Sequence, residues 1–396
     1  MPARSCAVVL LAVAAIAAGL HRSAAEPLTP ADEVAVRKLR PRVDPHQLVI
    51  HDGKLYASGF HAGRVTALDL LTGKELGRTQ LDGYERVVED EVDGQKVQKK
   101  VTHHYSSGSI VRAAGKLFVE QGFSDLILVI DPDTMRVLKR LPLGDGLLAA
   151  TPDGKTVVCA RTLKDEFHLI DADTYEHTTV AYPEGGTGIG AVAVSPDGRF
   201  VLLGIQRGGQ PPGAKEVIDK GNCFLAVYDR AQKKYAATIY MASSITQSVS
   251  EFVDALTYSP DGKTLYTGMF QATTGVRVID PAKWSLVADI RFEPNARNKY
   301  FAYTDPLALA FYRGWLFVAN RGNEEIVVID PATRKTAARL RFADAGHGFQ
   351  RLLVEGDRIY AADQEAVYEL DGWALARRLA ACPAKPLELT LKVRDE

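Results

Sequence analysis

The sequence predicts an all-β protein that is built from seven similar units of four short strands. Two recurring phrases carry this prediction. In the first, an apolar run ends in Asp and a tight turn follows, as at Val129–Thr134, Leu169–Thr174, Val278–Lys283 and Val328–Thr333. In the second, a Pro-Asp-Gly turn at 152–154, 196–198 or 260–262 precedes an alternating run. Proline presets φ and glycine accepts positive φ, so these are hairpin turns, and no helix is expected between the units.

The spacing of the units indicates how they assemble. The aspartates that end the apolar runs are Asp69, Asp131, Asp171, Asp229, Asp280, Asp330 and Asp371, and their shortest separations are 40 and 41 residues. Such a unit cannot bury both faces alone, so neighbours must stack and close into a ring. We therefore predict a seven-bladed β-propeller of four-stranded antiparallel blades, rather than an open β-solenoid or two packed sandwiches. The expected blades cover approximately 46–81, 106–143, 144–183, 188–242, 251–294, 304–343 and 346–382.

The two ends of the chain have separate roles in this scheme. Residues 1–25 combine Arg4, an apolar stretch and a small-residue cleavage pattern at Ser23–Ala25, which is typical of an export signal. A single propeller domain is then expected over 26–396. Two segments, Val34–Leu39 and the alternating strand at 387–394, could each close the ring, and the sequence leaves both choices open.

One unit carries a recognisable family pattern. Leu316–Asn323 followed by Ile326–Thr333 resembles the YVTN-type β-propeller repeat, in which an aromatic-Val-Thr-Asn phrase precedes a Val-x-Val-Ile-Asp run. The resemblance extends over about 44–382, although Asn320 is the only clear copy of the repeat's Asn. It implies the propeller fold and a group of mostly bacterial exported proteins of unassigned role. Seven-bladed relatives include sugar lactonases, and fold analogy alone transfers no activity.

Charge and cysteine usage exclude several classes. Without residues 1–25 the chain has 46 basic and 49 acidic residues, a net charge of −3, so it lacks the positive field of a general nucleic-acid binder. The remaining cysteines, Cys159, Cys223 and Cys382, are an odd number and far apart, which excludes C-x-x-C chemistry and leaves at least one without a partner in the chain.

The long insertions are expected on one face of the ring. If the strands of a blade are named a to d from the centre outward, 82–105, 240–251 and 293–304 are d–a connections and 205–222 is a b–c loop. All four open on the same side, and binding residues concentrate on such loops. The first contains a predicted hairpin, Val87–Val101 with an Asp93-Gly94 turn, which either pairs only with itself or docks a partner.

Polar residues are expected at the mouth of the central channel on that same side. The candidate ligand-binding residues are His46, Asp254, Asp305, His347, Arg161, Arg207, Arg321, His61 and His103. The first four could hold a divalent metal through imidazole and carboxylate groups, and the arginines could recognise an anion. The alternative is that these groups only face channel water and backbone donors.

The sequence favours an exported, periplasmic or extracellular, non-catalytic propeller that binds a protein partner or small ligand through its insertion-rich face. No cofactor is expected, and a divalent metal is the alternative. General nucleic-acid binding is not expected, although a local basic patch stays possible, and no transmembrane segment is expected after signal cleavage. The competing hypothesis is a lactonase-like or metal-dependent hydrolase that uses the His/Asp-lined channel mouth.

Overall fold

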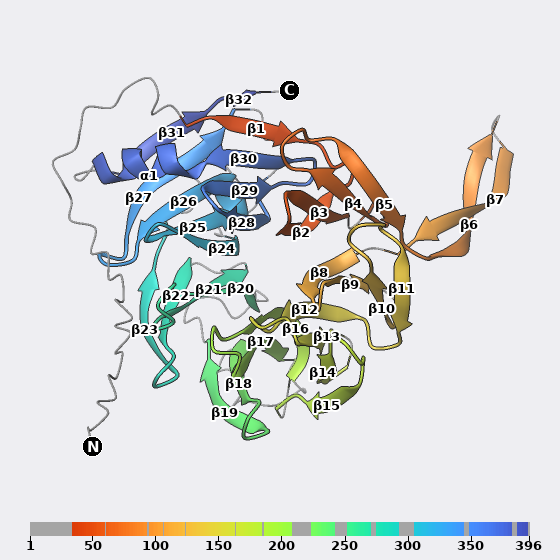
Figure 1. Ribbon diagram of the computed structural model, residues 1–396, viewed down its shortest axis with the longest axis horizontal. Coiled ribbons are helices and arrows are strands. Elements are labelled where there is room, and N and C mark those ends of the chain that lie inside the picture. The colour runs from red at the N-terminus through yellow and green to blue at the C-terminus, as the bar shows by residue number, and fades with distance from the viewer. Residues whose placement is uncertain are drawn as a thin grey trace, which may run out of the picture.

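The computed structural model describes residues 34–394 except 60, 93–94, 106, 123, 163, 184–185, 208–222, 242–251, 271–274, 293–304, 344–347 and 382–385. At some further positions within strands only the backbone is described. The predicted export signal, 1–25, lies outside the described residues. Seven antiparallel sheets are arranged in a ring and form a seven-bladed β-propeller, which confirms the predicted fold class (Figure 1).

Each blade has the expected order of strands from the centre outward. The innermost strands are β2 (Pro45–His51), β8 (Ser107–Ala113), β12 (Gly146–Ala150), β16 (Gly186–Val194), β20 (Phe252–Tyr258), β24 (Pro306–Tyr312) and β28 (Arg351–Glu355). The second strands are β3 (Lys54–Gly59), β9 (Lys116–Gln121), β13 (Thr156–Arg161), β17 (Phe200–Arg207), β21 (Leu265–Phe270), β25 (Trp315–Asn320) and β29 (Arg358–Ala362). Each innermost strand contacts the next around the circle, and β2 contacts β28 to complete it.

The outer half of each blade follows the same plan. The third strands are β4 (Arg64–Asp69), β10 (Leu126–Ile130), β14 (Glu166–Asp171), β18 (Cys223–Asp229), β22 (Val276–Asp280), β26 (Glu325–Asp330) and β30 (Val367–Asp371). The outer strands of the first six blades are β5 (Glu75–Gln80), β11 (Val137–Leu141), β15 (His177–Ala181), β19 (Lys234–Tyr240), β23 (Ser285–Ile290) and β27 (Lys335–Phe342).

Side-chain oxygens hold the turns that the sequence predicts. In the second blade one carboxylate oxygen of Asp131 accepts the N–H groups of Asp133 and Thr134, at 3.0 and 2.7 Å, and the Thr134 hydroxyl at 2.9 Å. These bonds lower the pKa of Asp131 because they stabilise its charged form. Ser195 and Asp197 make the equivalent bonds in a Pro-Asp-Gly turn, where the Ser195 Oγ accepts the N–H of Phe200 at 2.8 Å. The repeated Asp and Ser residues therefore fix the hairpins locally.

The hydrophobic core lies between adjacent blades. On β25, Phe317 and Ala319 pack toward the seventh blade, against a cluster that includes Phe349. The alternate residues Leu316 and Val318 pack toward the fifth blade. All five side chains are buried completely. Because both faces of such a strand are covered, it appears in the sequence as a continuous apolar run instead of an alternating one.

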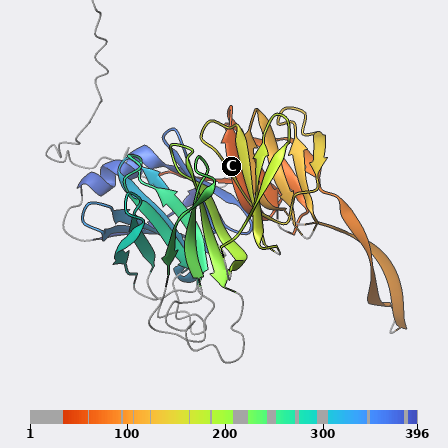
Figure 2. The ribbon, with the colours of Figure 1, turned by 90° about the horizontal axis from the view of Figure 1, so that it is seen from below.

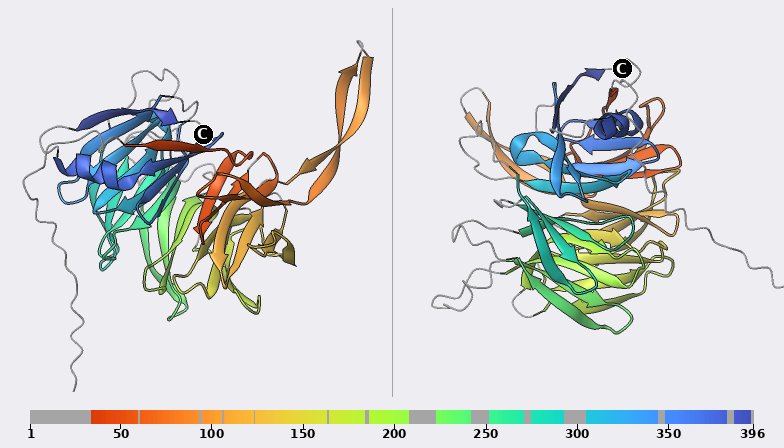
Figure 3. Two further views of the ribbon diagram at one scale, coloured as in Figure 1. Left: turned by 45° about the horizontal axis from the view of Figure 1, so that its top comes forward. Right: turned by 90° about the vertical axis from the view of Figure 1, so that its left-hand side faces the viewer.

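Both ends of the described chain take part in closure. β1 (Val36–Leu39) is the outer strand of the seventh blade and pairs antiparallel with β30. β31 (Leu387–Leu391) extends the sixth blade parallel to β27, and β32 (Val393–Arg394) pairs parallel with β1 (Figure 3). The C-terminal segment thus spans the outer edges of two neighbouring blades.

A helix, α1 (Gly372–Ala381), follows β30, so the expectation of no helix is wrong for this segment. Asp371 begins it, because its carboxylate accepts the N–H of Ala374 at 3.0 Å. Leu375 and Leu379 are buried against the last two blades. Since β1 already occupies the outer edge of the seventh blade, the chain after β30 is not needed as a strand. No helix in the described residues is long and apolar enough to cross a membrane.

The predicted hairpin in the first insertion is confirmed. β6 (Gly83–Val92) pairs antiparallel with β7 (Gln95–His104) along their whole lengths, and in the described part of the chain this sheet has two strands. The hairpin connects the first and second blades and extends away from the ring (Figure 2).

Candidate ligand cavity at the centre of the ring

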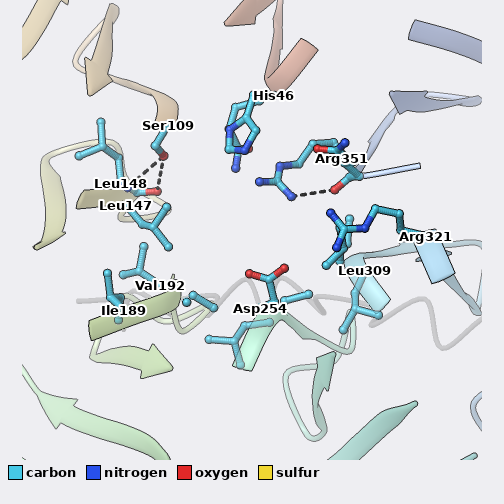
Figure 4. Close-up of a pocket in the computed structure, with 18 residues that line it drawn as sticks. His46, Ser109, Leu147, Leu148, Ile189, Val192, Asp254, Leu309, Arg321 and Arg351 are labelled. Atoms are coloured by element: carbon cyan, nitrogen blue, oxygen red, sulfur yellow. Dashed lines mark hydrogen bonds between the residues drawn. The ribbon is translucent and has the colours of Figure 1, made fainter. Parts of the chain in front are cut away.

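A cavity of about 420 Å³ lies where the seven innermost strands converge. Its lining residues belong to these strands, together with Arg321 and Gln350 (Figure 4). Most of them lie close to the start of an innermost strand, which is the end that each d–a connection enters. The cavity therefore lies toward the side of the ring to which the long insertions connect.

The cavity has two chemically different walls. His46, Arg351, Arg321 and Asp254 present charged or titratable groups on one side (Figure 4). The opposite wall is mainly aliphatic and is formed by Leu147, Leu148, Ile189 and Val192, with the hydroxyl of Ser109 hydrogen-bonded to the backbone of Leu148. A site of this kind fits a small molecule with a polar end and an apolar body.

Arg351 is held rigidly from two sides. Its Nη1 donates to the carbonyl oxygen of Gln350 at 2.7 Å. When the Gln47 amide is oriented with its oxygen toward the guanidinium, that oxygen accepts from Nε at 2.9 Å and from Nη2 at 3.2 Å. A guanidinium has five N–H donors, so these bonds leave two of them available for a ligand. Burial lowers the pKa of Arg351, but arginine retains its charge.

The carboxylate of Asp254 projects into the cavity (Figure 4). Among the described residues it has no hydrogen-bond or ion-pair partner. Burial, reinforced by the nearby Asp305 carboxylate, raises the pKa of Asp254 to about 6, while Arg351 and Arg321 oppose the rise. Asp254 is therefore largely ionised at neutral pH, and its partly buried carboxylate accepts no hydrogen bond from the described residues.

His46 faces the cavity as a neutral imidazole. Its Nδ1 lies 3.2 Å from the carbonyl oxygen of Gly108, which accepts a hydrogen bond if Nδ1 carries the proton. Burial and the charge of Arg351 lower the pKa of His46 to about 4. The imidazole is thus uncharged at neutral pH and contributes polarity without a charge.

Arg321 reaches the cavity from the end of β25, where a short 3-10 turn, η3 (Arg321–Asn323), begins. Its Nη2 lies 3.0 Å from a carboxylate oxygen of Asp305, and its N–H donates to the Asp305 carbonyl at 2.9 Å. The N–H of Asp305 in turn donates to Oδ1 of Asn320 at 3.1 Å. The Asn of the repeat phrase thereby fixes the ion pair that positions Arg321.

Of the other residues singled out in the sequence, two are placed away from the cavity lining. Arg161 is buried between the second and third blades, where it pairs with Asp125 at 2.5 Å and Glu166 at 3.3 Å. His61 is exposed and its N–H donates to Asp44 at 2.6 Å. The side chains of Arg207 and His103, and all of His347, lie outside the described residues. Cys159 and Cys223 are free and buried, and Cys382 also lies outside.

The described residues contain no group of three or more His, Cys, Asp or Glu side chains that could hold a metal ion. His46 and Asp254 line one cavity, and Asp305 contacts Arg321 at its edge, but these three do not form a ligand set. The metal alternative remains a prediction for the set that includes His347.

Sequence reasoning named His46, Asp254 and Arg321, and all three line the cavity. It missed Arg351, Gln47 and the aliphatic wall. The register of the innermost strands could have indicated Arg351. It is the first residue of β28, and His46 has a similar position as the second residue of β2. For the last blade the residue chosen from the sequence was His347, and the same register applied four residues later would have included Arg351.

The fold and this cavity define a seven-bladed β-propeller with a charged and aliphatic central site. No protein-family model matches the chain, and no curated protein is similar to it in sequence. Among solved structures, a chain of hydrazine synthase from Kuenenia stuttgartiensis is similar, with a TM-score of 0.62 and 17% identity over 83% of this chain and 94% of that one. At this identity the similarity shows the fold alone. The fold is widespread, since 1363 solved chains match, so function must be argued from the site.

Proposed function

We propose that this protein is an exported, non-catalytic β-propeller of the YVTN-type group that binds a small ligand in its central cavity. The observation that supports this most strongly is the pair of Asp254 and Arg351. Both present unused hydrogen-bonding capacity to one cavity, and they lie on the innermost strands of a closed ring. Such a ring holds the two groups in fixed positions, so a ligand would not have to order them when it binds.

A ligand could compensate the partial desolvation of Asp254. The Asp254 carboxylate is partly desolvated and is not compensated by a hydrogen bond among the described residues, which raises its pKa. A bound molecule that donates to this carboxylate would replace the lost water contacts. Export rests on residues 1–25, and N-terminal sequencing of the secreted protein should find Glu26 as the first residue.

The binding proposal can be tested with purified protein of residues 26–396. A thermal-shift screen of amino acids, monocarboxylates, amines and lactones would be followed by isothermal titration calorimetry on the hits. Val192→Trp fills the cavity from its aliphatic wall without replacing a charged group, and it should abolish binding. The exposed Asp173→Asn is the matched control and should bind as the wild type does. Hits that bind equally well to Val192→Trp would show that the cavity is not the binding site.

A hydrolase is the second candidate, and the pKa of Asp254 supports it. A carboxyl group with a pKa of about 6 can accept a proton near neutral pH, as a general base must. In a lactonase, Asp254 would take the proton of an attacking water while the free N–H groups of Arg351 stabilise the oxyanion. Turnover of a lactone panel that Asp254→Asn abolishes would replace the binding proposal with this one. Metal analysis of the wild type and His347→Ala tests the metal-dependent variant.

A further inference from the structure

We infer that the ligand of the central cavity is a small zwitterion with an aliphatic body, of which an α-amino acid or a dipeptide is the simplest form. The inference rests on the proposed binding function and assigns its ligand class. In this arrangement the ammonium group contacts the Asp254 carboxylate, the carboxylate contacts Arg351, and the aliphatic group lies against Leu147, Ile189 and Val192.

The balance of charge in the site selects a ligand without net charge. Among the described residues at the cavity, Arg321 and Arg351 contribute two positive charges, and Asp254 and Asp305 contribute two negative charges. His46 is neutral. An anion placed against Arg351 alone would approach the Asp254 carboxylate, and a cation placed against Asp254 alone would approach two guanidiniums. A zwitterion satisfies both groups at once and leaves the site electrically balanced.

The two charged groups are available because they do not neutralise each other. Arg351 interacts with Asp254 through space, but no ion pair joins them within 4.0 Å in the described residues. The Arg351 guanidinium instead donates hydrogen bonds to the Gln47 amide oxygen and the Gln350 carbonyl oxygen, and these bonds fix its orientation. A gap thus separates an anion from a cation whose two remaining N–H groups donate to none of the described residues. A ligand that carries the opposite pair of charges would bridge this gap.

The remaining surface of the cavity favours an aliphatic body over a sugar. None of the described lining residues is Phe, Tyr or Trp, so the aromatic platform on which a sugar ring packs is missing from them. The wall opposite the charges consists of Leu, Ile and Val side chains, which favour burial of hydrocarbon. A volume of about 420 Å³ lies at the lower end of the range for small-molecule sites.

Isothermal titration calorimetry with matched probes tests the inference. The probes are leucine, the dipeptide Leu-Leu, isocaproate, which lacks the amine of leucine, and isoamylamine, which lacks its carboxylate. We expect leucine or Leu-Leu to bind, and isocaproate and isoamylamine to bind about tenfold or more weakly, because each loses a charge-assisted hydrogen bond.

Two variants assign the charges of the ligand to their partners. The Asn side chain of Asp254→Asn has nearly the same shape as that of Asp but carries no charge. In this variant the affinity for leucine should fall to the affinity for isocaproate. Arg351→Met should have the mirror effect, so that isoamylamine binds as well as leucine. Asp173→Asn should change neither ratio, and thermal melts confirm that each variant is folded.

The outcomes separate this inference from the proposed function. If isocaproate or isoamylamine binds the wild type as tightly as the zwitterions do, the zwitterion class is refuted while binding in the cavity stands. The zwitterion class is also refuted, and binding in the cavity stands, if Val192→Trp abolishes the binding of uncharged molecules of the screen and of no others. If no molecule binds in a way that Val192→Trp abolishes, the proposed function and the ligand class fail together.

Discussion

Asp254→Asn should make the empty protein more stable, and the gain should grow with pH. The variant removes a carboxylate that is ionised inside the cavity without a hydrogen-bond partner among the described residues. Burial raises the pKa of this group from its ordinary value of 3.8 to about 6 in the folded protein. The folded state therefore binds more protons than the unfolded state between these two values, so folding stability falls as pH rises through this window.

The difference between the two pKa values sets the size of the effect. It corresponds to about 3 kcal/mol when Asp254 is fully ionised. This is an upper bound, because water in the cavity screens the carboxylate. We expect the free energy of unfolding of Asp254→Asn, minus that of the wild type, to increase by about 2–3 kcal/mol between about pH 4 and pH 7.

Urea unfolding of both proteins across this pH range measures the difference directly. The subtraction is necessary because His46 titrates in the same window with the opposite sign. Its pKa is lowered to about 4 by burial and Arg351, and Asp254 is not among the groups that perturb it. Asp173→Asn, which removes an exposed carboxylate outside the cavity, is the matched control. A difference that stays flat for Asp254→Asn would mean that the carboxylate is already compensated in the empty protein, and the case for a ligand donor at this position would be lost.

Three further changes test other parts of the structure. His46→Gln should be less sensitive to acid than the wild type, because a histidine whose folded pKa is lowered to about 4 loses stability as pH falls from about 6.5; acid-induced melting measures this. Glu325→Gln should lower the free energy of unfolding of the protein by about 3 kcal/mol, since the buried Glu325 carboxylate pairs with Arg339 and Arg341 of β27. An unchanged free energy of unfolding in urea would contradict this role. Removing the C-terminal segment that contains Leu387–Leu391 should lower the melting temperature by several degrees, because β31 covers the outer edge of the sixth blade; an unchanged calorimetric transition would show that the edge needs no cover.

The fold could be predicted because its local and global signals coincide. Asp131 makes its turn with bonds to residues two and three positions away, so the turn depends only on adjacent sequence. The fully buried runs, such as Leu316–Ala319, are apolar on both faces because each blade packs on two neighbours. Repetition of these local signals at a nearly constant spacing then implies the ring.

Closure and the helix could not be predicted in the same way. Both Val36–Leu39 and Leu387–Leu391 have the pattern of a closing strand, and both lie in the outer part of a sheet, on different blades; the short β32 pairs beyond Val36–Leu39. The partner strand of Val36–Leu39 lies 334 residues away in the sequence and that of Leu387–Leu391 lies 49 residues away, as the pairs Val36–Leu370 and Ala338–Leu387 show, and no local signal encodes either pairing. The helix α1 has its own local signal, an Asp371 cap before Ala, Leu and Arg residues, but it occupies the place where the repeat led us to expect a strand.

The site was harder to predict than the fold because the two depend on different parts of each blade. Stability comes mainly from the second and third strands, whose side chains interdigitate between blades, as those of Phe317 and Val328 do. Of the innermost-strand residues that face the cavity, the aliphatic Leu148 and Ile189 belong to these clusters, but the charged Asp254 and Arg351 do not. Substitutions of the charged residues would change the chemistry of the cavity and leave the packing between blades intact. The same scaffold can therefore surround unrelated sites. A structural similarity with 17% identity and a TM-score of 0.62 shows the propeller fold, whereas the ligand depends on the few side chains at the centre of the ring.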